Sequence, residues 1–381
     1  MRKLLAGIAA SALLMALPGG TPAGAGPSQG GLSTDNIQYV TYVPFEVGTA
    51  TGMSLFNKDK NMIVTGWKSF SIYDVSNVEA PALITTVPFG FEFENEDVAT
   101  NGKIMLFSET LPNSVLHVWD IEDVSNPVEI AALDGAGDHT MSCILKCKWG
   151  YGSDGKVVDL RDPANPVLQE ENWHELTELQ GGGHDIEEFK NGFILTSPIS
   201  DPLQIIDVRN PLKPKVLARG ENPNPTGFLF HSGRWPNEGK DDFVLMQGEK
   251  NARTRCTEND GPFMTFDATE YKKTKTLTLI DTYKLRNGTV SDGNPPANGL
   301  GCSAHWFEEH PKFKNGGLVA MGAYEHGTRF LDIDKKGKIT EVGWFFPFAG
   351  STSAAYWVNK EIVYSIDYTR GIDILRWTDK V

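Results

Sequence analysis

The segment Val157-Val-Asp159-Leu-Arg-Asp-Pro-Ala-Asn-Pro166 joins a short apolar run to an aspartate and then to a turn that contains proline. The same order returns in Ile205-Ile-Asp207-Val-Arg-Asn-Pro-Leu-Lys-Pro214 and in Phe70-Ser-Ile-Tyr-Asp74-Val-Ser-Asn-Val-Glu-Ala-Pro81. Proline has no N–H to donate to a β-ladder, so each copy predicts a strand that stops at a turn.

This repeat runs along most of the chain. A fourth copy ends at Asp120, and weaker copies end at Asp267, Asp332 and Asp373. The aspartates of the repeat are separated by 46, 39, 48, 60, 65 and 41 residues, a spacing that favours about four strands per unit. We therefore predict an all-β fold, a seven-bladed β-propeller over residues 37–381, in which radial repetition protects most strand edges.

The two ends of this region predict how the ring closes. The last unit ends at Val381, directly after its third strand, and the first apolar run, Ile37-Gln-Tyr-Val-Thr-Tyr-Val-Pro44, has no unit of its own. We expect this N-terminal run to supply the missing outer strand of the last blade.

The copies at 70–81, 157–166 and 205–214 resemble the LVIVD repeat, a bacterial propeller motif of the form L-x-I-x-D-V-S-N-P-x-x-P. The resemblance covers four of the predicted blades well and three poorly. It implies the propeller fold and says little about activity, because propellers carry many unrelated functions.

The N-terminal residues predict export. Arg2 and Lys3 precede the apolar run Leu4–Leu17, and the small residues Ala23-Gly24-Ala25 follow it. That run is too short to span a bilayer comfortably, so residues 1–25 are interpreted as a cleaved secretory signal, with an uncleaved N-terminal anchor as the alternative. Residues 26–36 are expected to form a flexible mature N-terminus of a secreted, extracellular or periplasmic protein.

The chain is acidic, with a formal net charge of −14, which becomes −16 when Arg2 and Lys3 are removed with the signal. Such a surface repels nucleic-acid phosphates and anionic membranes. We therefore expect no nucleic-acid partner and no membrane insertion, but a monomer that acts on a small-molecule substrate.

Four cysteines remain in the exported part: Cys143, Cys147, Cys256 and Cys302. An even number in an exported chain favours two disulfides. Cys143 and Cys147 can close one tight hairpin, which leaves Cys256 to pair with Cys302. The alternative is a thiolate metal site, for which the C-x3-C spacing without a second close pair is weak support.

Histidines recur at one position of the repeat. Alignment of the predicted inner strands places His139, His184, His231 and His305 at equivalent positions in four consecutive blades, and a gapless alignment puts Glu94 at that position in the blade before them. Half of the 8 histidines thus fall at one repeat position. Neutral imidazoles converging on an axis predict a transition metal ion, with Fe or Cu favoured and Zn or Mn possible.

An arrangement with one histidine from each of four blades is similar in ligand geometry to the iron centre of the carotenoid-cleavage oxygenases, although the sequences show no resemblance. Glu94 can act as a further ligand or as an acceptor that orients an imidazole. Other candidate acceptors are Asp138, Asp185, Glu187 and Glu308. Polar residues that merely bind channel water are the competing interpretation.

Loops around the mouth of the channel add candidate catalytic residues. Two candidates lie in these loops: His326 as a general acid or base, and Arg370 as a substrate contact. Glu94, at the repeat position of the histidines, is the third catalytic candidate. The leading hypothesis is a secreted metal-dependent oxidoreductase or oxygenase acting on a small organic molecule. Two alternatives stay open: a metal-dependent lyase or hydrolase, and a non-catalytic propeller that binds a protein or cell-wall partner.

Overall fold

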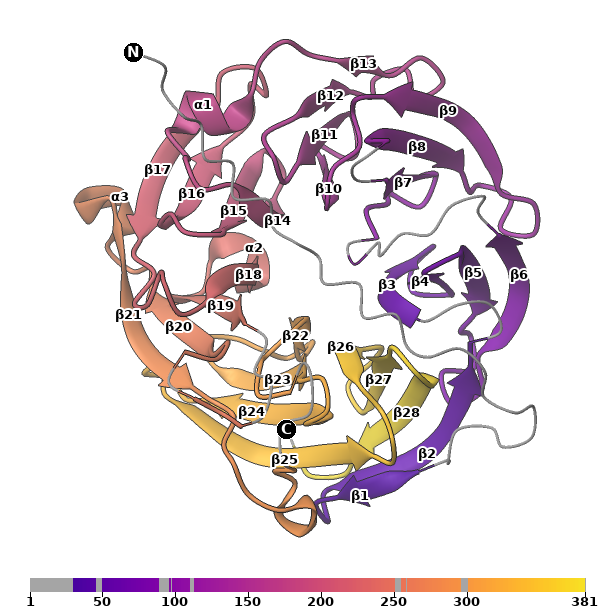
Figure 1. Cartoon of the computed structure of the whole chain (residues 1–381), viewed down its shortest axis with the longest axis vertical. Coiled ribbons are helices and arrows are strands. Elements are labelled where there is room, and N and C mark those ends of the chain that lie inside the picture. The colour runs from indigo at the N-terminus through magenta and orange to yellow at the C-terminus, as the bar shows by residue number, and fades with distance from the viewer. Residues whose placement is uncertain are drawn as a thin grey trace.

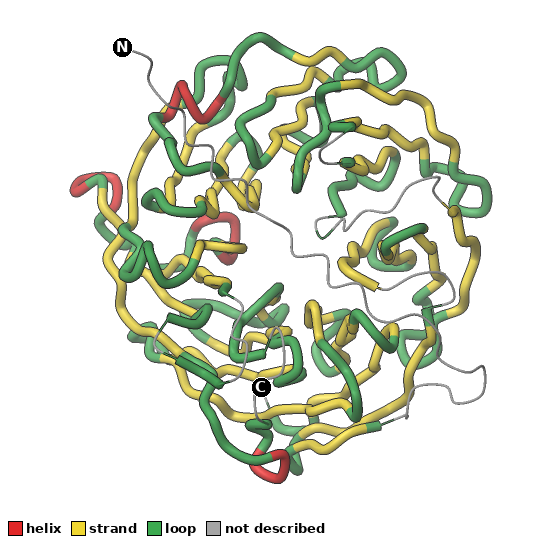
Figure 2. The backbone as a smooth tube through the Cα atoms, viewed as in Figure 1, coloured by secondary structure: helices red, strands yellow, loops and turns green. Residues whose placement is uncertain are grey.

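The computed structural model describes residues 30–45, 50–88, 96, 98–109, 113–250, 255–257, 259–295 and 301–380. Its strands form a ring of radially arranged antiparallel sheets around a common central axis (Figure 1). Strands and turns make up almost all of this backbone (Figure 2). The predicted signal peptide, residues 1–25, and Glu94 both lie outside the described residues.

Each unit of the ring runs outward from an inner strand. The first three units contain β3 (Ala50–Phe56), β4 (Asn61–Gly66), β5 (Ser69–Asp74) and β6 (Ala82–Pro88); β7 (Ile104–Ser108), β8 (Val115–Asp120) and β9 (Val128–Asp134); and β10 (Met141–Ile144), β11 (Trp149–Gly152), β12 (Val157–Asp159) and β13 (Val167–Leu168).

The next two units share an outer edge, because β17 and β21 pair in parallel. They contain β14 (Gly183–Lys190), β15 (Phe193–Pro198), β16 (Leu203–Asp207) and β17 (Lys215–Gly220), then β18 (Leu229–Arg234), β19 (Phe243–Glu249), β20 (Phe263–Asp267) and β21 (Thr276–Tyr283). The final two contain β22 (Phe307–Glu309), β23 (Gly317–Gly322), β24 (Thr328–Ile333) and β25 (Ile339–Pro347), then β26 (Thr352–Trp357), β27 (Ile362–Asp367) and β28 (Gly371–Trp377).

The N-terminal run closes the ring as predicted. Strand β2 (Ile37–Pro44) pairs antiparallel with β28, from Ile37 opposite Trp377 to Pro44 opposite Gly371. A shorter strand, β1 (Gly31–Ser33), pairs with the outer edge of β25. Strand β1 was not predicted, because it lies in the segment 26–36 that was expected to be flexible. Its pairing satisfies backbone groups that β25 would otherwise expose.

The aspartate of the repeat has a local structural function. The carboxylates of Asp74, Asp159 and Asp207 each accept the backbone N–H two residues later, at 2.8, 3.0 and 3.0 Å. This Asx turn ends the third strand of the unit and starts the proline-containing turn. One of the weaker copies departs from the pattern, because Asp373 is buried and pairs with Arg370 at 2.7 Å.

Buried apolar side chains lie between neighbouring units. Phe230 and Phe266 pack against Ile205 of the preceding unit, and Met62 packs in a cluster with Ile374 across the point of closure. Among the described residues, one such cluster joins each pair of adjacent units around the ring. Because the clusters form a closed circle, burial of apolar surface holds the inner strands in fixed positions around the channel.

Four short helical segments lie outside the sheets: α1 (Trp173–Thr177), α2 (Pro236–Gly239), α3 (Tyr271–Thr274) and the 3-10 turn η1 (Val290–Asp292). None of the helices in the described part of the chain is long and apolar enough to cross a membrane.

Both predicted disulfides are present. Cys143–Cys147 closes the turn between β10 and β11, and Cys256–Cys302 joins two loops that are distant in the sequence. No cysteine is free, so the alternative of a thiolate metal site is wrong for the oxidised protein.

Candidate metal centre

The four predicted histidines come together on the channel axis. Each lies just before the inner strand of its unit or within its first three residues. The ring centroids of His139 and His184, His184 and His231, and His231 and His305 are 4.7, 3.8 and 4.3 Å apart. His231 and His305 are fully buried, His184 is 7 % exposed, and His139 is half-buried. The row of imidazoles therefore opens toward solvent at its His139 end.

A carboxylate that the sequence alignment missed lies among these rings. Oε2 of Glu96 is 3.1 Å from Nε2 of His231, 3.5 Å from Nε2 of His305 and 3.9 Å from Nε2 of His184. The gapless alignment had assigned this position to Glu94, two residues earlier. The acidic run Phe93-Glu-Asn-Glu-Asp97 holds three carboxylates, and its sequence contains no feature that fixes which one reaches the axis.

The backbone of Glu96 lies directly against the first unit. A Cβ atom on Gly52 would come within 2.0 Å of the Glu96 carbonyl oxygen. Gly52 lies at a register shift between β3 and β4, where the Thr65 hydroxyl bonds to its N–H and its carbonyl, each at 3.2 Å. A side chain at position 52 would therefore clash with the backbone of Glu96, so Glu96 can take this position only because residue 52 is glycine.

Three further side chains complete the surroundings. The Trp306 indole N–H donates to Oε2 of Glu96 at 3.0 Å. Glu249, at the end of β19, places Oε2 at 3.8 Å from Nε2 of His231 and accepts a hydrogen bond from the Tyr324 hydroxyl. The Tyr324 ring packs on His305, with centroids 4.6 Å apart. Neither Glu249 nor Trp306 was predicted as a site residue, because neither occupies the repeat position of the histidines.

Backbone carbonyls fix two of the imidazoles. Nδ1 of His184 donates to the His231 carbonyl at 3.0 Å, and Nδ1 of His305 donates to the Ser353 carbonyl at 2.7 Å. Since Nδ1 carries the proton, Nε2 is the atom that faces Glu96, and this is how metal-ligating histidines are usually oriented. The carboxylate Asp138, expected to orient an imidazole, instead accepts the backbone N–H of His139 at 2.8 Å.

In the metal-free centre Glu96 and His305 carry opposite charges, whereas His184 and His231 are neutral. Burial acts to raise the pKa of Glu96, but His305 and His231 outweigh it and hold this pKa well below its usual range. Burial acts to lower the pKa of His305, yet Glu96 raises it to about 9. Burial and neighbouring imidazoles lower the pKa values of His184 and His231. At neutral pH the metal-free centre thus holds a Glu96 carboxylate beside a His305 imidazolium.

The ligand atoms are close enough for metal binding. Three sets of side chains on the axis place one ligand atom each within 4.8 Å of one another: Glu96 with His139 and His184, Glu96 with His231 and His305, and Glu249 with His184 and His231. Nε2 of His305 is fully buried and faces Oε2 of Glu96 at 3.5 Å. In the metal-free centre a proton on this nitrogen pairs with the carboxylate, and a cation bound by the axial residues would replace that proton.

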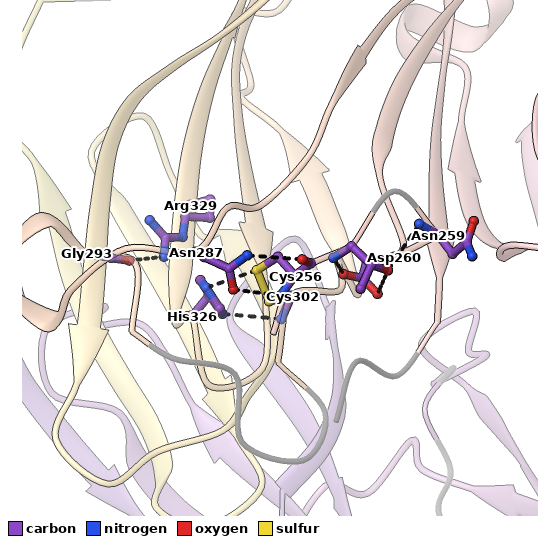
Figure 3. The surroundings of a disulfide bond; sticks show 9 residues. Cys256, Asn259, Asp260, Asn287, Gly293, Cys302, His326 and Arg329 are labelled. Carbon is purple, nitrogen blue, oxygen red and sulfur yellow. Dashed lines mark hydrogen bonds between the residues drawn. A yellow bond between two sulfur atoms is a disulfide. The ribbon is translucent and has the colours of Figure 1, made fainter. Parts of the chain in front are cut away.

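The other predicted catalytic residues are not part of this centre. His326 is fully buried against the Cys256–Cys302 disulfide, where Nδ1 accepts the Cys302 N–H at 3.3 Å and burial lowers its pKa to about 4 (Figure 3). Arg370 is buried in an ion pair with Asp373 and donates to the Phe348 carbonyl at 2.9 Å. Both side chains are used in packing and hydrogen bonding within the fold, and neither lies on the open rim where the sequence placed them.

A second polar layer lies further along the inner strands. Glu187, Arg234 and Glu308 each follow a centre histidine by three residues, and Nε of Arg234 lies 2.6 Å from Oε2 of Glu309. Burial raises the pKa values of Glu187 and Glu308 to about 7. A cavity of about 270 Å³ opens beside Glu187, Arg234 and Trp306.

Comparison with solved structures supports the fold alone. The β-propeller domain of Cps50 (Swd1) from Myceliophteria thermophila aligns with 88 % of this chain and 98 % of its own, at 12 % identity and a TM-score of 0.61. A functionally unknown protein from Desulfotomaculum acetoxidans aligns with 87 % of this chain and 90 % of its own, at 12 % identity and a TM-score of 0.56.

Neither protein-family models nor curated protein sequences give a match. The chain is therefore a β-propeller with a candidate His/Glu metal centre, and its LVIVD-like repeats remain a resemblance.

Proposed function

We propose that this protein is an exported metal-dependent oxidoreductase that acts on a small organic molecule at the channel axis. The observation that carries the proposal is the set of four imidazoles gathered around Glu96, which form two groups with this carboxylate whose ligand atoms lie within 4.8 Å of one another. Imidazole nitrogens with a carboxylate oxygen suit iron, copper or manganese, the ions that supply one-electron chemistry when bound.

The residues of the chain have separate functions in this proposal. His139, His184, His231, His305 and Glu96 would hold the ion, and the carbonyls of His231 and Ser353 would keep two of the imidazoles in the ligating tautomer. His139 is the half-buried member of this set, and a substrate can approach the ion from its side. The Tyr324 hydroxyl, bonded to Glu249, can hold a proton next to the centre.

Export rests on two features of the chain. The N-terminal basic and apolar residues have the pattern of a secretory signal, and both cysteine pairs are disulfides. Disulfides persist in oxidising compartments.

Metal analysis of the protein purified from the periplasm or medium tests the proposal. We expect at least one equivalent of a redox metal, with loss of that metal in His184→Ala and His231→Ala. His117→Ala is the matched control, since His117 bonds to Glu129 at 2.7 Å and is not part of the centre. A protein that takes up no stoichiometric Fe, Cu or Mn, or that keeps the ion in both centre variants, would contradict the proposal.

A further inference from the structure

We infer that the centre is dinuclear, with two metal ions bridged by Glu96. Two pairs within the continuous row of imidazoles each form a close set with the same carboxylate: His139 and His184 with Glu96, and His231 and His305 with Glu96. This inference rests on the proposed function, since it concerns how many ions the same centre holds.

The first pair has the spacing of two ligands on one ion. Nε2 of His139 and Nε2 of His184 are 3.1 Å apart. Two nitrogens at bond lengths of about 2.0–2.1 Å from one ion lie about 3 Å apart when they occupy neighbouring coordination positions. The second pair faces Glu96 from the other end of the row, at 3.1 Å from His231 and 3.5 Å from His305.

Both carboxylates of the centre lie between the pairs. Glu96 belongs to both sets, and Glu249 forms its own close set with His184 and His231, which is one imidazole from each pair. A carboxylate has two oxygens and can bind two ions at once. Shared carboxylates between two nitrogen pairs are the ligand pattern of a two-metal site, in which the ions lie about 3.5–4 Å apart.

The number of donors also favours two ions. Four imidazole nitrogens and two carboxylates exceed the four ligands of a tetrahedral site and would fill a six-coordinate ion completely, leaving no position for a substrate. Divided between two ions, the same donors give each ion two nitrogens and shared carboxylate oxygens. Each ion then keeps open positions, as catalytic metal sites require.

Titration of the chelator-treated protein with Mn²⁺ tests this inference. We expect two equivalents to bind to the unaltered chain and the electron paramagnetic resonance signal of the second equivalent to be weakened by coupling between neighbouring ions. His139→Ala and His305→Gln, which each alter one pair, should each bind a single ion with an uncoupled signal. His117→Ala should bind two, as the unaltered chain does.

The outcomes separate this inference from the proposed function. Saturation of the unaltered chain at one equivalent, with the same ion lost in both pair variants, would overturn the dinuclear centre and leave a single-ion enzyme. Absence of Mn²⁺ binding, together with no stoichiometric Fe or Cu in the purified protein, would overturn both. Because the stoichiometry of the unaltered chain decides the question alone, a variant that fails to fold does not remove the test.

Discussion

The indole N–H of Trp306 donates to Oε2 of Glu96 at 3.0 Å, across 210 residues of sequence. The same side chain lines the cavity that contains Glu187 and Arg234. Trp306 therefore contacts the imidazoles and Glu96 and also lines the cavity beside the second polar layer. This contact fixes the orientation of a carboxylate that has no regular strand to hold it.

Replacement of this donor tests its importance for the centre. Trp306→Phe keeps an aromatic ring but removes the N–H, so Glu96 should lose its fixed orientation. We expect the affinity for Mn²⁺ to fall about 10–100-fold, the usual effect of losing a partner that orients a ligand. Competition with a chelator measures the affinity, and Trp357→Phe, in an outer cluster with Phe330 and Trp377, is the control. Unchanged affinity in Trp306→Phe would show that Glu96 is held by other contacts.

The affinity of the centre for a metal should depend on pH through His305. Glu96 raises the pKa of His305 to about 9, so at lower pH a proton occupies the atom that must bind the ion. We expect affinity to rise about tenfold per pH unit between pH 6.5 and 9 and about one proton to be released per His305 that binds. Calorimetry in buffers of different ionisation enthalpy counts that proton. Binding at pH 7 without proton release would show that His305 does not ligate.

The sequence predicted the ring and the imidazoles for the same physical reason. Strands, proline turns and the aspartates of Asx turns repeat at each blade, so His184 and His231 could be placed by alignment to equivalent positions. Glu96 could not, because the acidic run before β7 offers three carboxylates and no turn residue to set the register. His326 and Arg370 were placed on an open rim, since a loop position reveals neither the disulfide nor the Asp373 carboxylate that bury them.

The second polar layer should make stability depend on pH. Burial raises the pKa of Glu308 to about 7 from an ordinary value of 4.5, so the folded protein binds more protons than the unfolded chain between these values. The free energy of unfolding should therefore fall as pH rises from 4.5 to 7. The side chain keeps 27 % exposure, so solvent screens part of this effect. Glu308→Gln should be more stable than the unaltered chain by about 1–2 kcal/mol at pH 8, with little difference at pH 4.5.

Denaturant unfolding at the two pH values measures this difference. Glu309→Gln is the matched control, because Glu309 forms the 2.6 Å contact with Arg234 and its loss should destabilise the protein. If Glu308→Gln and the unaltered chain are equally stable at pH 8, the ionised carboxylate of Glu308 does not destabilise the folded protein.

The two disulfides should contribute unequally to stability. Cys256–Cys302 spans 46 residues and Cys143–Cys147 spans 4. In the chain-entropy model the longer loop stabilises by about 4 kcal/mol and the shorter by about 2 kcal/mol. Replacement of both cysteines of a pair by serine, followed by denaturant unfolding, compares them directly. A larger loss for the Cys143–Cys147 pair would contradict the entropic account and point to packing at the β10–β11 turn.

Gly52 should control the position of Glu96 by sterics alone. In Gly52→Ala the new Cβ would stand 2.0 Å from the Glu96 carbonyl oxygen, so either β3 or the Glu96 backbone must move. The Thr65 hydroxyl bonds to both backbone groups of Gly52, which makes movement of Glu96 the less costly response. We expect at least a tenfold loss of Mn²⁺ affinity together with destabilisation of about 1–3 kcal/mol. Gly150→Ala is the control, because its Cβ would meet only flexible side-chain atoms, the nearest being Sδ of Met141 at 3.1 Å and Cδ1 of Leu160 at 3.4 Å. If Gly52→Ala loses stability but binds Mn²⁺ as tightly as Gly150→Ala does, then β3 moves to relieve the clash. In that case the position of Glu96 does not depend on glycine at 52.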